Sequence, residues 1–177
     1  GNLHQGQVVE QVARQFAGRP GGAVPDRLPG RYTGGEFRLS KELDQTHILL
    51  GFPSVKYGDP DYYAALLLST LLGGGMSSRL FQEIREKRGL VYSVYSFTTP
   101  FLDGGLFGIY AGTGGEEARE LIPVTLAELQ KVQQSVGMDE LSRARAQLKS
   151  SLLMSLESTG SRCEQIARQL QIFGRLI

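Results

Sequence analysis

The chain has 177 residues, 41% of them hydrophobic and 21% charged, values typical of one globular domain with a substantial core rather than of a disordered segment. Its 19 basic and 18 acidic residues leave a net charge of +1, which carries no signature of nucleic-acid or acidic-membrane binding. The lone cysteine, Cys163, excludes an internal disulfide, and His4 and His47 lie too far apart to place two zinc ligands on one helix.

The N-terminal part of the sequence divides into a helix and a linker. Apolar residues recur at helical spacing over 6–17. Residues 18–30 then contain too many prolines and glycines for a helix or a central strand. We therefore expect two units: residues 1–30, a helix and interdomain linker, and residues 31–177, the main domain.

The main domain begins with two strand candidates and a buried helix. Phe37 and Leu39 alternate with polar residues, and residues 46–52 form an apolar run, so each place predicts a strand. The helix predicted over 62–72 is apolar nearly all round, which indicates that it lies in the core.

A turn of three glycines, Gly73, Gly74 and Gly75, ends this helix and leads to a short second one. We expect Ser77 or Ser78 to cap the second helix, which runs to residue 88 and stops at a glycine. Backbone N–H groups at a helix start can bind phosphate, but no Gly-Lys-Ser/Thr follows. A tight helix-to-helix turn is the favoured interpretation, and close passage of a peptide along the glycines is a third.

The rest of the chain contains two strands followed by three helices. The strands are expected over 91–97 and 105–111. The helices are expected over 116–134, from 139 to just before 160, and over 161–173. Strand pairs and helices in separate blocks predict an α+β fold, with an antiparallel-rich mixed sheet and helices packed on one face.

Arg85 and Tyr92 are the two side chains best suited to hold a ligand. Arg85 lies at the edge of the apolar stripe of the short helix, and Tyr92 follows early on the next strand, on the face expected to carry Val94 and Ser96. A guanidinium and a hydroxyl that converge across a glycine turn suit a carbonyl or carboxylate. From spacing alone, a surface arginine and a half-buried tyrosine are the simpler interpretation.

The other candidates have structural explanations. His47 lies inside an apolar strand, where a lone histidine is more often a hydrogen-bonded core residue than a metal ligand. Cys163 has no histidine nearby, and no serine lies in a Gly-x-Ser-x-Gly motif, so nucleophilic catalysis has no support.

The segments from Leu72 to Phe81, LGGGMSSRLF, and from Arg85 to Ser93, REKRGLVYS, closely resemble the pitrilysin family. This is the insulinase-like and mitochondrial-processing-peptidase-like group of zinc metallopeptidases. The match is to the second, C-terminal and non-catalytic half-domain. The chain start, Gly1-Asn2-Leu3, and the helix after it resemble the segment before the interdomain linker, so the resemblance covers nearly the whole chain.

The resemblance implies a pitrilysin-like half-domain fold in a parent that cleaves peptides or unfolded segments inside a chamber. The family holds its zinc in the first half-domain, on an inverted His-x-x-Glu-His helix that is absent here. The arginine and tyrosine of the second half match Arg85 and Tyr92. In the family, this arginine holds the substrate backbone, and the tyrosine donates a hydrogen bond near the scissile carbonyl.

We therefore expect zinc in the parent, no metal in this chain, and no activity of this chain alone. Its expected partners are an N-terminal catalytic half-domain, in the same or a second chain, and a peptide substrate. A homo- or heterodimeric parent is expected, without nucleic acid or a membrane span. The alternative is a non-catalytic scaffold or partner subunit of the same family, such as a respiratory core protein.

The Gly75–Met76 junction bears on the type of parent. The non-catalytic subunit of the mitochondrial enzyme carries a long glycine-rich insertion there, which this sequence lacks. A bacterial single-chain or catalytic-type parent is therefore favoured over the dedicated substrate-recognition subunit. We expect a bacterial cytoplasmic protein, with the mitochondrial matrix and the periplasm as alternatives. The start without methionine indicates a fragment, and whether residue 177 is the native C-terminus is open.

Overall fold

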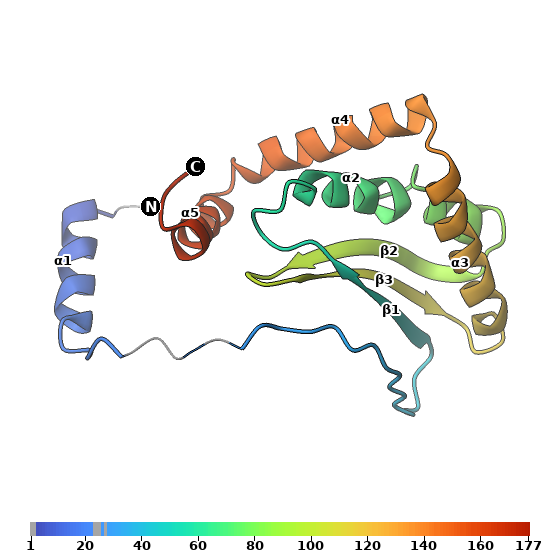
Figure 1. Ribbon diagram of the computed structural model, residues 1–177, viewed down its shortest axis with the longest axis horizontal. Helices are drawn as coiled ribbons and strands as arrows, with labels where there is room; N and C mark the ends of the chain where they lie inside the picture. The colour runs from blue at the N-terminus through green and yellow to red at the C-terminus, as the bar shows by residue number, and fades with distance from the viewer. Residues whose placement is uncertain (1–2, 23–25, 27) are drawn as a thin grey trace.

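The computed structural model describes residues 3–22, 26 and 28–177. Helices and strands follow one another as Figure 1 shows. In chain order they are α1 (Gln5–Phe16), β1 (Thr46–Ser54), α2 (Tyr62–Gly73), the π-helix η1 (Phe81–Glu86), β2 (Val91–Pro100), β3 (Gly105–Thr113), α3 (Ala118–Gln134), α4 (Met138–Ser155) and α5 (Thr159–Phe173). The predicted α+β class is confirmed.

The three strands form one sheet in the order β1-β3-β2, with β3 in the middle. Tyr110 of β3 faces Leu49 on one side and Tyr95 on the other. All strand pairing among the described residues is antiparallel, so the sheet is antiparallel rather than mixed. None of the three strands contains a charged residue, so one face packs against helices without burying a charge.

The core lies between the sheet and the helices. Figure 1 shows α2 and α4 on one side of the sheet, while the segment before β1 passes along the other side. Helix α3 lies at the end of the sheet in this view, and its Leu121 joins the same core cluster. This confirms helices on one face. The core residues that are almost fully buried come from α2, η1 with its flank, β3 and α3: Leu72, Leu80, Ile84, Ile109 and Leu121. Leu80 and Ile84 lie four positions apart, so η1 and the residue before it present one apolar side to the sheet.

The short helix predicted after the glycine turn is mainly a π-helix. Its bonds run from residue i to i+5, as between the Lys87 N–H and the Gln82 carbonyl at 3.1 Å. The expected serine cap is wrong, because η1 has no side-chain cap, and the buried Ser78 Oγ has no hydrogen-bond partner among the described residues. Gly89 does stop the helix, with a φ of +65° that favours glycine.

The strand expected around Phe37 and Leu39 does not form. Residues 28–45 contain neither helix nor strand, and the Phe37 and Leu39 side chains are 86% and 65% exposed. Gly34 and Gly35 just before them have φ values of +68° and +139°, which interrupt an extended chain. An alternating pattern forms a stable strand only where another strand pairs with it, and no described strand pairs with this segment.

The N-terminal helix α1 has no buried residue. Its predicted apolar stripe is present but exposed, and no other part of the described chain covers it. The division into residues 1–30 and 31–177 stays a prediction, and residues 1–2, 23–25 and 27 lie outside the described residues. Among the described helices, none combines the length and the apolar composition needed to cross a membrane.

Candidate functional site

Arg85 lies near the end of η1, and its side chain is exposed. Its guanidinium carbon lies 4.8 Å from the centroid of the Phe81 ring, one helical turn earlier. A cation over an aromatic ring is held in place without loss of its charge or its hydrogen-bond donors. The guanidinium is therefore oriented by the helix that carries it.

The basic residues around Arg85 differ from it in their partners. The ion pairs of the segment 79–88 are Arg79 with Glu140, Lys87 with Glu83 at 2.8 Å, and Arg88 with Glu83 at 3.2 Å and with Glu120 at 3.0 Å. The hydrogen bond from Lys87 is the main cause of the lowered pKa of the Glu83 carboxyl. Among the described residues, Arg85 is the one basic side chain of this segment without a carboxylate partner. Its charge is available to a ligand.

Tyr92 lies at a β-bulge rather than on the buried face of β2. Val91 pairs with Thr113 and Ser93 with Gly112, so Tyr92 between them has no partner on β3. It is 63% exposed. The expectation that Tyr92 shares a face with Val94 is wrong, because the extra residue of a bulge breaks the alternation of the strand. The bulge turns the tyrosine toward solvent.

A short turn links the two predicted site residues. The Gly89 N–H donates to the Arg85 carbonyl and the Leu90 N–H to the Ile84 carbonyl, each at 3.0 Å. Arg85 is therefore the next-to-last residue of η1, and Tyr92 is the second residue of β2 after the turn. Both side chains are exposed, and no hydrogen bond joins them among the described residues. Their convergence on one substrate group stays a prediction.

The glycines before η1 have a packing role. A Cβ on Gly73 would lie 2.3 Å from the Ser96 backbone nitrogen, and one on Gly74 would lie 2.5 Å from the Thr70 carbonyl oxygen. No residue larger than glycine fits where α2 meets β2, and the Ser96 hydroxyl donates to the Ser69 carbonyl at 2.7 Å beside this contact. Close packing therefore accounts for Gly73, while contact of the turn with a peptide stays a prediction.

The two histidines do not form a metal site. His47 is exposed on β1, with its Nδ1 2.7 Å from the Tyr110 hydroxyl, so its expected place in the core is wrong although the hydrogen bond is present. His4 immediately precedes α1. Within the described ranges, no three histidine, cysteine, aspartate or glutamate side chains are grouped so that they could hold a metal ion.

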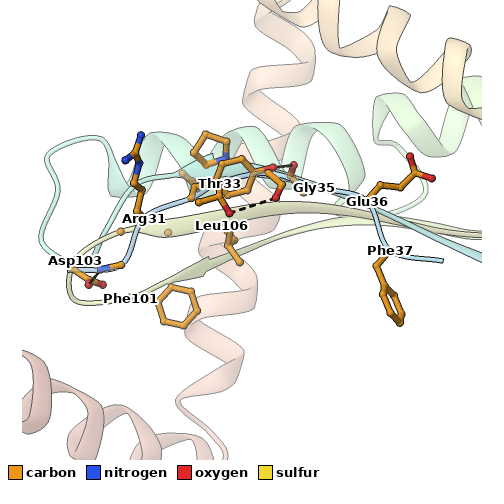
Figure 2. Close-up of a pocket in the computed structure, with 16 residues that line it drawn as sticks. Arg31, Thr33, Gly35, Glu36, Phe37, Phe101, Asp103 and Leu106 are labelled. Atoms are coloured by element: carbon orange, nitrogen blue, oxygen red, sulfur yellow. Dashed lines mark hydrogen bonds between the residues drawn. The ribbon is translucent and has the colours of Figure 1, made fainter. Parts of the chain in front are cut away.

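A hollow of about 820 Å³ lies away from these residues, between the segment 30–37, the end of β1 and the β2–β3 hairpin. The Tyr32 hydroxyl donates to the Gly51 carbonyl at 2.7 Å, and the Gly30 N–H donates to the Asp103 carboxylate. Figure 2 shows Asp103 and Phe101 at one end of the hollow and Glu36 and Phe37 toward the other. Sequence reasoning did not find it, because contacts between residues this far apart leave no local pattern.

Comparison with known proteins places these features in a family. Residues 1–148 match the family described as "Peptidase M16 inactive domain". An uncharacterized zinc protease of Rickettsia bellii is 36% identical over 178 residues, which are 100% of this chain and 43% of that protein. A probable mitochondrial-processing peptidase subunit alpha of Schizosaccharomyces pombe is 30% identical over 187 residues, 93% of this chain and 37% of that protein.

A solved structure supports the same conclusion. The crystal structure of a peptidase M16 inactive domain from Pseudomonas fluorescens matches with a TM-score of 0.66 and 28% identity, over 86% of this chain and 38% of that one. This chain spans less than half the length of the relatives it matches. It belongs to the peptidase M16 family, the group that includes pitrilysin and insulinase, and it matches that family's inactive domain.

Proposed function

We propose that the parent protein is a zinc metalloendopeptidase that cleaves peptides or unfolded segments in an enclosed chamber. In this proposal the present domain contributes Arg85 and Tyr92 to the substrate. The observation that carries the proposal concerns Arg85, which is exposed and oriented on Phe81. No carboxylate of the described residues pairs with it, while its basic neighbours are paired.

The chemistry of the two side chains supports this role. A guanidinium offers several N–H donors in a fixed plane, which suits successive carbonyl groups of an extended peptide. Because Arg85 already lies on the Phe81 ring, it loses less side-chain freedom when it binds. The Tyr92 hydroxyl can donate to an oxygen on which negative charge develops, an interaction that is strong where water is excluded.

The described residues do not fit a zinc site, so we assign the metal to the other half of the parent. Relatives named zinc proteases support zinc in the parent. When bound, the metal would polarise the scissile carbonyl and lower the pKa of a water molecule. We further propose that this half pairs with a catalytic half in a homo- or heterodimeric assembly. The named bacterial relatives support a bacterial parent, for which we propose a cytoplasmic location.

A second candidate is a non-catalytic partner or scaffold subunit. The relative from Schizosaccharomyces pombe favours it, because it is named as one subunit of a processing peptidase. The sequence of the parent's other half separates the two functions. An inverted His-x-x-Glu-His motif there supports the peptidase, and its absence supports the partner subunit.

The experiment compares Arg85→Ala and Tyr92→Phe with Arg88→Ala in the full-length parent. Removing one oxyanion donor costs about a hundredfold to a thousandfold in kcat, so we expect Tyr92→Phe to lower turnover of a peptide strongly. Arg85→Ala should lower kcat/KM, and Arg88→Ala, which removes a paired arginine of the same segment, should leave it unchanged. Zinc content should not change in any variant. Normal turnover by both site variants would refute the proposal.

A further inference from the structure

Arg79 connects the glycine turn to the start of α4. Its Nε donates to Glu140 Oε2 at 2.8 Å, and its Nη2 donates both to Glu140 Oε1 and to the Ser135 carbonyl, the latter at 2.7 Å. The side chains of Arg79 and Glu140 are only 17% and 20% exposed. A two-pronged arginine–carboxylate pair that is largely shielded from water is stronger and more directional than a surface ion pair.

The carboxylate in this pair is itself fixed by α4. Glu140 Oε1 accepts a bond from the Gly137 N–H at 2.6 Å, as in a capping box at the start of the helix. Arg79 is the main cause of the lowered pKa of the Glu140 carboxyl, so the pair stays charged at neutral pH. Arg79 therefore binds a carboxylate that is itself fixed at the start of α4.

Two amides hold the rest of the turn. Gln147 of α4 donates its side-chain N–H to the Gly74 carbonyl, and Gln82 of η1 donates to the Met76 carbonyl at 2.7 Å. The turn is thus tied to α4 at Gly74 and at Arg79, and to η1 at Met76. A π-helix is rarer and less stable than an α-helix, so its position depends on such flanking contacts.

If Arg79 were displaced, Arg85 would be displaced with it. Arg79 lies just before η1, and the almost fully buried Leu80 and Ile84 couple the start of this segment to its end. Arg85 follows Ile84 and lies over Phe81, the first residue of η1. A shift at the start of η1 therefore moves both the guanidinium and the ring beneath it.

We infer that Arg79, through Glu140 and the Ser135 carbonyl, is a positioning residue that sets the placement of Arg85 toward the substrate. The inference rests on the proposed function, in which Arg85 contacts the peptide. Arg79 itself does not contact the substrate. Its pairing with Glu140 links α4 to the start of η1, and through η1 to Arg85.

The test is a double-mutant cycle in the full-length parent, built on Arg79→Lys and Arg85→Ala. Lysine keeps a positive charge beside Glu140 but cannot bond both carboxylate oxygens and the Ser135 carbonyl together. We expect Arg79→Lys to lower kcat/KM about tenfold to a hundredfold, the effect of a small misplacement. Zinc content and the thermal midpoint should stay close to wild type. The matched control, Arg88→Lys, should leave kcat/KM unchanged.

The cycle separates positioning from a general effect on the fold. If Arg79 acts through Arg85, adding Arg79→Lys to Arg85→Ala produces no further loss. If the losses of kcat/KM in the two single variants multiply in the double variant, the inference is overturned. It is also overturned if Arg79→Lys keeps the wild-type kcat/KM while Arg85→Ala is impaired. If Arg79→Lys does not fold, Glu140→Gln replaces it in the cycle. We expect Glu140→Gln to lower kcat/KM by a smaller factor, and to cause no further loss when Arg85→Ala is already present. Wild-type activity of Arg85→Ala overturns the proposed function instead, and the inference with it.

Discussion

Replacement of Gly73 by alanine should destabilise the domain strongly, although the change adds one methyl group. That Cβ would lie 2.3 Å from the Ser96 backbone nitrogen and 2.9 Å from the Tyr95 carbonyl carbon, so α2 and β2 must separate by about 1 Å to reach ordinary contact. Overpacking of a tight core costs about 1–3 kcal/mol. The higher helix propensity of alanine offsets less than about 1 kcal/mol of this cost at a helix end.

We therefore expect Gly73→Ala to lower the free energy of unfolding by about 2 kcal/mol, which corresponds to a fall of about 4–8 °C in Tm for a chain of this size. Gly51→Ala is the matched control, because a Cβ on Gly51 meets no atom of the described residues within 4 Å. It should be neutral or stabilise by up to about 1 kcal/mol. Urea and thermal unfolding of the 177-residue chain measure the stability of both variants. Equal stability of the two variants would show that close packing does not explain Gly73.

Two further predictions concern the core and the partly buried Arg79–Glu140 ion pair. Ile84→Ala should cost about 2–5 kcal/mol in unfolding free energy, because Ile84 is fully buried in η1 and a cavity would remain; a change below about 1 kcal/mol in urea unfolding would contradict this. The folded-state pKa of Glu140 is lowered by Arg79, so its contribution to stability is present above about pH 4.3 and is lost as the pH falls through the lowered value. Unfolding free energies measured from pH 7 downward should therefore fall more steeply in the wild type than in Glu140→Gln, and parallel curves would refute the assignment.

Local patterns predicted most of the elements correctly. The apolar run at 46–52, the helix after residue 61 and the stop at Gly89 depend on side-chain periodicity and backbone freedom, which act over a few residues. The strand predicted around Phe37 does not form, because its alternating pattern has no partner strand among the described residues. The motif from Leu72 to Ser93 was sufficient for the family, which the comparisons confirm.

The state of the candidate site depended on contacts between distant residues. The sequence by itself determined that Arg85 lies near the end of a helix, that Gly89 stops this helix and that Tyr92 lies early on the next strand. Only the tertiary structure decided that Tyr92 is exposed, because a bulge against β3 removes it from the alternation. It also decided that, within the described part of the chain, Arg79 pairs with a glutamate 61 positions away and Arg88 with one 32 positions away, while no carboxylate pairs with Arg85. Ion pairs over such separations form when helices pack, and no local pattern encodes them.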